Sequence, residues 1–259
     1  MDVIETKITK DTNIIRNIEA DIDTYYKIVE GVRLPIKIYK SNNQQKAKTL
    51  ILTIHGGGWY AIKEDSDSWD GGWMNFQAQY YVDKGYTTAA ISYRDIKFCE
   101  STTVFDLIED CKDAVAYLQE KVEYDRLIII GDSAGGHLAI ELGFDNDINV
   151  DFVVAANPVL DLTQNSMRYV AKCNEELIKA SPIFNIKKTD TKFLILHGTD
   201  DTVVDMKISE KFCEKMKACG NDCAFHKIKN AKHAFLISRY ESSDMEVYEH
   251  MKRLDKYIE

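Results

Sequence analysis

A serine flanked by glycines, in the hexapeptide Gly131–Gly136 (GDSAGG), constrains the fold of this chain more than any other feature. It directly follows an apolar run that predicts a strand, Leu127–Ile130, and directly precedes a helical pattern over about 134–143. A serine on such a sharp strand-to-helix turn has a strained backbone and needs small neighbours. The N-terminus of the following helix directs N–H groups and partial positive charge at a developing oxyanion. The spacing therefore predicts a nucleophilic Ser133, with the N–H of Ala134 as an oxyanion donor.

A second glycine-rich turn, His55–Trp59 (HGGGW), ends the β-branched run Thr49–Ile54. Three successive glycines let the chain turn so that bare N–H groups face a cavity, which is what an oxyanion hole requires. A glycine turn alone is weak evidence, but its combination with the serine turn favours one shared site. Gly57 and Gly58 are the expected donors beside Ala134.

Strand and helix patterns alternate along the whole chain. An antiparallel edge pair is expected within 24–40, and further strands at Thr49–Ile54, Thr87–Tyr93, Leu127–Ile130, Phe152–Ala156, Lys192–Leu196 and Ala224–Ile228, with helices at about 72–84, 103–121, 134–143, 205–218 and 239–258. This alternation implies right-handed βαβ crossovers and helices on both faces of a mostly parallel sheet. The stretch 160–190 shows short helical pieces and no strand, so we expect a surface excursion from one domain spanning 1–259.

Composition narrows the class of function. The 259 residues are 45% hydrophobic and carry a net charge of −9 without a basic block, which suits one sizeable core and argues against nucleic acid as a partner. We find neither a run of roughly 18 apolar residues, as a membrane span needs, nor a secretory signal in the polar N-terminal segment. The six cysteines show no CxxC or metal-ligand spacing, so free thiols, no metal and a cytoplasmic location are expected.

The two glycine turns on successive parallel strands resemble those of α/β-hydrolase carboxylesterases, specifically those similar to hormone-sensitive lipase and the small acetyl- and feruloyl-esterases. The resemblance runs from about residue 49 to the C-terminus and includes Tyr93-Arg94 and the late segment His197–Asp201 (HGTDD). It implies the α/β-hydrolase fold, an α/β architecture with a mostly parallel eight-stranded sheet flanked by helices and a small lid insertion near 160–190. It also implies that the catalytic residues follow the chain order nucleophile, acid, base.

The same resemblance implies where the acid lies. The family pattern H-G-x-x-D-x-x-V, met here from His197 to Val204, puts the acid at Asp201. Asp200 is the alternative in the same loop. A few relatives carry the acid one strand earlier, where this chain has Asp161.

Six histidines are candidates for the base. His233 lies in the loop between the last strand and the final helix, which is the family's place for the base. The other five are expected to be structural: His55 and His137, which belong to the two glycine turns and brace them, and His197, His226 and His250.

Together these residues predict a serine carboxylesterase with a Ser133-Asp201-His233 triad that works through an acyl-enzyme intermediate and needs no cofactor. Short acyl chains are expected because 54 residues before His55 leave little for a cap and 160–190 offers one lid wall. A kynurenine-formamidase-like or other amide hydrolase using the same site is the alternative, although such formamidases tend to show HGGYW where this chain has Gly58. The expected partner is a small-molecule ester, and a homodimer is an assembly that the sequence leaves open.

Overall fold

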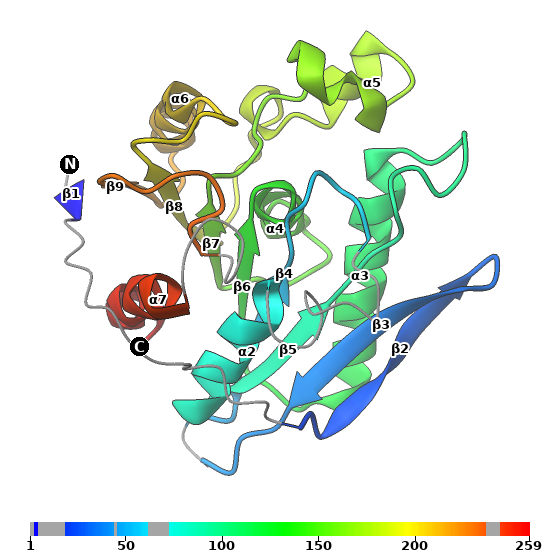
Figure 1. The fold of residues 1–259 in the computed structure, drawn as a ribbon, viewed down its shortest axis with the longest axis vertical. Helices are drawn as coiled ribbons and strands as arrows, with labels where there is room; N and C mark the ends of the chain where they lie inside the picture. Colours follow the sequence, from blue (N-terminus) through cyan, green and yellow to red (C-terminus); the bar gives the residue numbers. More distant parts are fainter. Residues whose placement is uncertain (1–2, 5–18, 44–45, 62–72, 237–243) are drawn as a thin grey trace.

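The computed structural model describes residues 3–4, 19–43, 46–61, 73–236 and 244–259 (Figure 1). Within these residues, nine strands form one sheet in the order β1-β9-β8-β7-β6-β4-β5-β3-β2. Neighbouring strands are parallel except in the pairs β2–β3 and β3–β5. The strands are β1 (Val3–Ile4), β2 (Ile22–Val29), β3 (Val32–Tyr39), β4 (Thr49–Ile54), β5 (Thr87–Ile91), β6 (Arg126–Asp132), β7 (Phe152–Ala156), β8 (Lys192–Gly198) and β9 (Cys223–Ile228).

The predicted mostly parallel sheet with flanking helices is confirmed. Strands β2 to β9 are the expected eight, and their ends lie within two residues of the predicted ones. The two-residue strand β1 was not predicted; it pairs in parallel with the outer edge of β9. Such pairing uses backbone groups alone, and so a strand this short leaves no hydrophobic pattern to recognise.

Helices cover both faces of the sheet (Figure 1). The larger part of the core lies under α3 (Val104–Lys121), α4 (Ala134–Gly143) and α6 (Met206–Ala218). The opposite face packs against α2 (Trp73–Asp83) and α7 (Asp244–Ile258). Because both faces are covered, the central strands are buried at nearly every position, which explains their continuous rather than alternating apolar sequence.

A buried ion cluster fixes the edge pair β2–β3 to this framework. The carboxylate of Asp110, on α3 and fully buried, accepts hydrogen bonds from Arg94 Nε and Nη2, each at 2.7 Å. Lys27 Nζ on β2 lies 2.7 Å from the same carboxylate. The arginine of the Tyr93-Arg94 pair therefore serves the packing of α3 against β2.

The stretch 160–190 contains no strand, as predicted, and holds the short helices η1 (Asn165–Val170), α5 (Asn174–Lys179) and η2 (Pro182–Phe184). Three of its apolar side chains, Val170, Leu177 and Ile183, are buried in the core. They are therefore not available to a lid wall. Throughout the described part of the chain, we find no helix with the length and apolar character needed to cross a bilayer.

Candidate active site

Ser133 lies between the end of β6 and the start of α4, in the strained backbone that its sequence context predicts. Its φ of 54° and ψ of −117° are unusual for a residue with a side chain. The turn is tight because α4 lies directly against the end of β4: a Cβ atom on Gly135 would lie 2.2 Å from the Ile54 carbonyl oxygen. Only glycine fits at this position, and the turn directs the serine side chain away from the sheet.

The structure brings Ser133, His233 and Asp201 together from the ends of three strands, β6, β9 and β8. The Ser133 hydroxyl lies 2.9 Å from His233 Nε2, and His233 Nδ1 lies 2.8 Å from Asp201 Oδ2. Both separations are hydrogen-bond distances, over which a proton can pass from the serine to the imidazole. Ser133 is 6% exposed and His233 8%, so the pair is largely shielded from bulk water.

Asp201 is the most heavily hydrogen-bonded group of the three. Its Oδ1 accepts from the N–H groups of Val203 and Val204 at 2.8 and 3.0 Å. Its Oδ2 accepts from His233 and also from His197 Nε2 at 3.1 Å. Burial raises the pKa of this carboxyl, but the hydrogen bonds from His197, His233 and Val204 outweigh burial and hold it well below the usual range. Asp201 is therefore ionised at neutral pH.

The two alternative acids point elsewhere. Asp200 is exposed, and its carboxylate accepts a hydrogen bond from the neighbouring Thr199 hydroxyl at 2.9 Å. The Asp161 carboxylate accepts from the N–H and hydroxyl of Thr163 and from the Gln164 amide, so it closes its own turn. Of the three aspartates weighed from the sequence, Asp201 is the one at hydrogen-bond distance from His233.

The glycine turn after β4 lies against the serine. A Cβ atom on Gly56 would lie 2.7 Å from the Asp132 carbonyl oxygen and 3.1 Å from Ser133 Cβ, so the two turns touch. In the described part of the chain, the backbone N–H groups of Gly57, Gly58 and Ala134 donate to no other residue. These three donors are therefore unused in the two glycine turns that meet at Ser133.

His55 stabilises the glycine turn through hydrogen bonds. Its Nδ1 donates to the Gly56 carbonyl at 2.7 Å, and its Nε2 accepts from the Ser92 hydroxyl at 2.9 Å. The Tyr93 hydroxyl donates to the His55 carbonyl at 2.9 Å, and the two rings stack. Burial lowers the pKa of His55 to about 4, so the ring is neutral at pH 7. Tyr93 of the Tyr93-Arg94 pair thereby holds the same turn.

His137, one helical turn after the serine, is also buried and neutral. Its Nε2 donates to the Ala180 carbonyl at 2.8 Å, and its Nδ1 accepts from Trp59 Nε1 at 3.4 Å. Burial lowers its pKa to about 4. His137 therefore links α4 to both the glycine turn and the 160–190 excursion.

Three further residues near the site have roles that the sequence analysis missed. His197, expected to be merely structural, orients Asp201; the signal was its position in the H-G-x-x-D pattern itself. The Tyr169 hydroxyl, from η1, donates to the Gly58 carbonyl at 3.0 Å. Asp132 is buried beside the triad, and burial, together with the charge of Asp201, raises its pKa to about 7 against the opposing influence of His233.

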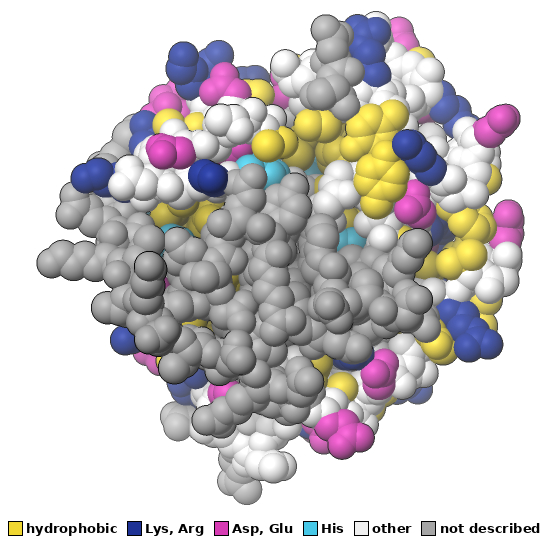
Figure 2. Space-filling view, viewed as in Figure 1, with side chains coloured by type: hydrophobic (Ala, Val, Ile, Leu, Met, Phe, Trp, Pro, Cys, Tyr) yellow, Lys and Arg dark blue, Asp and Glu magenta, His cyan; other side chains and the backbone are white. Residues whose placement is uncertain are grey.

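Exposed aromatic side chains flank the glycine turn. Tyr60 and Tyr169 stack with ring centroids 6.2 Å apart, and both are more than a third exposed. Figure 2 shows hydrophobic side chains gathered next to histidine side chains on the face seen in Figure 1. This stack forms an apolar border on one side of the site.

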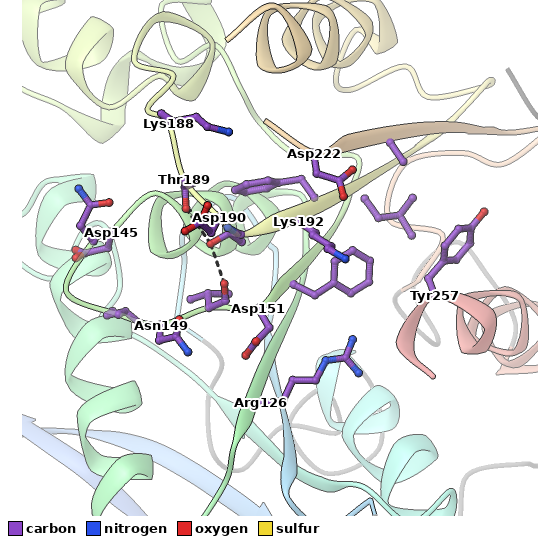
Figure 3. Close-up of a pocket in the computed structure, with 18 of the residues that line it drawn as sticks. Arg126, Asp145, Asn149, Asp151, Lys188, Thr189, Asp190, Lys192, Asp222 and Tyr257 are labelled. Carbon is purple, nitrogen blue, oxygen red and sulfur yellow. Dashed lines mark hydrogen bonds between the residues drawn. The ribbon is translucent and has the colours of Figure 1, made fainter. Parts of the chain in front are cut away.

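A large hollow among the described residues lies elsewhere. It measures about 900 Å³ and is found at the amino ends of β6, β7 and β8 (Figure 3). Acidic and basic side chains are mixed there, including Asp151, Asp190, Arg126 and Lys192, and Ser133 does not line it. Since ligands of open α/β sheets bind outside the carboxyl ends of the strands, we assign the active site to the opposite edge. No group of three or more potential metal ligands occurs among the described residues.

An α/β-hydrolase of the esterase class is defined by the strand order of the sheet, the strained serine turn and the side chains that are hydrogen-bonded in line with the serine. Residues 36–172 match the BD-FAE family, and the chain belongs to this family of esterase-like α/β-hydrolases.

Solved esterase structures are similar over nearly the whole chain. Est2 of the Planctomycetes species Thermogutta terrifontis, with propionate bound, is 25% identical with a TM-score of 0.73, covering 92% of this chain and 93% of that one. The same organism's esterase 2 phosphonylated by cyclosarin is 23% identical with a TM-score of 0.75, covering 94% of each chain.

Curated relatives are far longer. The non-reducing polyketide synthase Preu6 of Preussia isomera is 28% identical over 148 residues, which are 52% of this chain and 6% of that protein. The non-reducing polyketide synthase atr1 of Stereocaulon alpinum is 25% identical over 129 residues, 44% of this chain and 5% of that protein. The chain thus spans only a small part of the length of these synthases.

Proposed function

We propose that this protein hydrolyses short-chain acyl esters with Ser133 as nucleophile, His233 as general base and Asp201 as the acid that orients it. The observation that carries the proposal is the pair of hydrogen bonds that joins Ser133 Oγ, the His233 ring and Asp201 Oδ2. Such a chain makes a neutral serine nucleophilic at neutral pH, because the proton leaves as the new bond forms.

Acyl transfer proceeds in two halves. His233 Nε2 takes the serine proton while Oγ attacks the ester carbonyl carbon, and the resulting imidazolium then protonates the departing alcohol. Water enters, gives a proton to the same nitrogen and attacks the acyl-enzyme carbonyl; the imidazolium then returns this proton to Ser133 Oγ as the bond to the acyl group breaks, which releases the carboxylic acid. Asp201 remains ionised throughout and holds the imidazole in the tautomer that presents Nε2 to the serine.

The tetrahedral oxyanion needs donors that are already in place. The N–H groups of Gly57, Gly58 and Ala134 serve this purpose in the proposal, since none of them donates to another residue in the described part of the chain. Removal of one such donor in a serine protease costs about 10²–10³ in kcat. The positive end of α4 adds to the same stabilisation.

Short acyl groups suit the surroundings of this site. The Tyr60–Tyr169 stack offers one apolar wall, whereas Val170, Leu177 and Ile183 of the same excursion are buried in the core. Among similar proteins, the Thermogutta terrifontis esterase has been solved with propionate and with butyrate bound. The proposed substrates are therefore small-molecule esters with acyl groups of about two to four carbons.

A serine-directed organophosphonate tests the nucleophile. The reagent is expected to add to Ser133 alone, as shown by peptide mass spectrometry, and to abolish hydrolysis of p-nitrophenyl acetate. Ser133→Ala is expected to fold normally and lose about 10⁶-fold in kcat, by the subtilisin precedent. Ser101→Ala, a change of an exposed serine, is the matched control. Labelling at another residue, or an active Ser133→Ala variant, contradicts the proposal, and faster hydrolysis of N-formylkynurenine than of any ester would assign the same site to amides.

A further inference from the structure

Two cysteines that the esterase chemistry does not use lie in direct contact. Cys213, in the middle of α6, and Cys223, the first residue of β9, have their sulfur atoms 3.0 Å apart. This is closer than the ordinary van der Waals contact of two sulfurs, and about 1 Å of movement separates it from the roughly 2.0 Å of a disulfide bond. Cys219, which is nearer to Cys223 in sequence, is exposed at the end of α6.

The two thiols differ in access. Each residue is 3% exposed. Cys213, however, lines a surface hollow of about 260 Å³ between α6 and β9, together with Glu210, Lys217 and His226, and Cys223 does not line it. A small solute that enters this hollow therefore meets Cys213 first, and the Cys223 sulfur is in contact with that of Cys213.

Neither thiol belongs to a metal site, because the described residues contain no cluster of three potential ligands. The hydrogen bond from Cys223 and burial raise the pKa of Cys213 well above its usual value. Cys213 is therefore a thiol at neutral pH, and only an oxidant small enough to enter the hollow can reach it.

We propose that Cys213 and Cys223 are an oxidisable pair in which a peroxide attacks Cys213 and Cys223 closes a disulfide. In the first step the Cys213 sulfur, after losing its proton, bonds to one peroxide oxygen; the O–O bond breaks and the other oxygen leaves as water. In the second step the Cys223 sulfur bonds to the resulting sulfenic acid, the S–O bond breaks and a second water leaves. Two thiols are oxidised and one peroxide is reduced.

The bond would join two elements that carry the site. Helix α6 begins directly after the loop of Asp201, and β9 leads into the loop of His233. A link between them leaves the reacting atoms in place and restricts the unfolded chain, so the melting temperature is expected to rise by roughly 5 °C on oxidation.

The decisive experiment maps the thiols after exposure to hydrogen peroxide. The protein carries Cys99→Ser, Cys173→Ser and Cys219→Ser, which remove the three exposed thiols. It is then unfolded in iodoacetamide and analysed by mass spectrometry. We expect one peptide pair linking Cys213 to Cys223, with a mass about 2 Da below the sum of the two reduced peptides, and full reversal by dithiothreitol. Complete alkylation of both cysteines after peroxide treatment overturns the proposal.

Single variants test the order of the two steps. In Cys223→Ala no second thiol can close the bond, so dimedone is expected to trap a sulfenic acid on Cys213. In Cys213→Ala, the matched control, Cys223 is expected to remain unlabelled. Labelling of Cys223 instead, or a disulfide from Cys223 to Cys219 in the protein with all its cysteines, would contradict the assignment. Peptide mapping of the unsubstituted protein decides the pairing even if a variant fails to fold.

Discussion

A single oxygen atom, Oδ2 of Asp201, accepts hydrogen bonds from two histidines that have different roles. It accepts from His233, which faces Ser133, and from His197, whose other nitrogen lies 2.9 Å from the Ser209 hydroxyl of α6. His197 and the two valine N–H groups hold the carboxylate in place in addition to His233. The aspartate is thus positioned independently of the base that it serves, which keeps the geometry fixed while the imidazole gains and loses its proton.

Asparagine substitutions separate the two adjacent aspartates. Asp201→Asn is expected to lower kcat by about 10⁴, as in the serine-protease template, because an amide can favour the wrong imidazole tautomer. Asp200→Asn is the matched control, and it is expected to cost less than about threefold because the Asp200 carboxylate bonds to Thr199 instead. The measurement is kcat on p-nitrophenyl acetate for both variants. The reverse order would contradict the assignment, and two mild effects would turn attention to Asp161.

The residues that could be predicted from the sequence lie in turns determined by local sequence, whereas the residue that was missed makes a contact between distant segments. Ser133, Gly57 and Gly58 lie in turns whose backbone shape demands particular residue types, so local sequence predicts the shape. Tyr169 touches Gly58 across 111 positions of sequence, and its contact depends on how η1 packs. No local pattern marks a tyrosine for such a contact.

At the scale of elements, η1 and the glycine turn form one unit. The Tyr169 hydroxyl bonds to the Gly58 carbonyl, and its ring meets both Trp59 and Tyr60. The excursion was predicted to be free of strands, and it is, but short helical pieces do not reveal which apolar side chains face inward. Val170 is buried while the adjacent Tyr169 is exposed, a division that packing against the core decides.

A series of esters with acyl chains of increasing length tests how far the apolar wall beside the glycine turn reaches. We expect kcat/KM to peak between acetyl and butyryl esters and to fall by roughly tenfold or more at octanoyl, because carbons beyond the wall stay in water and add no binding. A series of p-nitrophenyl esters measures the profile. An optimum at eight carbons or longer would mean that the excursion encloses a real acyl tunnel.

Two substitutions separate the contribution of the Tyr169 ring to activity from that of its hydroxyl. Tyr169→Phe keeps the stack with Tyr60 and removes the hydrogen bond to Gly58, so it is expected to lower kcat by about two- to tenfold through a looser glycine turn. Tyr169→Ala also removes the wall and is expected to raise KM for butyryl esters more than for acetyl esters. Equal KM changes for both esters would show that the ring does not contact the acyl group.

At the scale of the whole molecule, the order of elements was predictable because each parallel strand carries its own continuous apolar run, and each helix its own spacing. The contacts between these elements could not be predicted from the sequence. The contact of Cys213 with Cys223 follows from the packing of α6 on β9, and β1 follows from the open backbone edge of β9. Both depend on the assembled sheet, which no single segment encodes.

The stability of the whole fold should depend on the buried carboxyl of Asp132. Its pKa is raised from an ordinary value near 4 to about 7, so between these limits the folded state binds a proton that the unfolded state has lost. Stability therefore falls as pH rises from about 4 to 7, by roughly 4 kcal/mol from this group, and is constant above. Asp132→Asn has no titrating carboxyl at this position, so its stability relative to that of the natural protein increases between pH 4 and pH 8.

Urea unfolding of both proteins at these two pH values measures the difference. Asp200→Asn, which alters an exposed carboxylate, serves as the control for a lost surface charge. Parallel profiles for the natural protein and Asp132→Asn would contradict the buried-acid account.

The separation of Ser133 from His233 by 100 residues has a consequence for synthesis of the chain. A ribosome that has completed β6 and α4 has already made the proposed nucleophile and oxyanion donors, yet the proposed base lies beyond β9. In the proposed mechanism, a nascent or truncated chain that lacks His233 has no base to take the serine proton. In the proposed mechanism, hydrolysis therefore begins only after the chain through His233 has been made, and the appearance of activity in a cell-free reaction times the docking of β9 and its following loop onto the sheet.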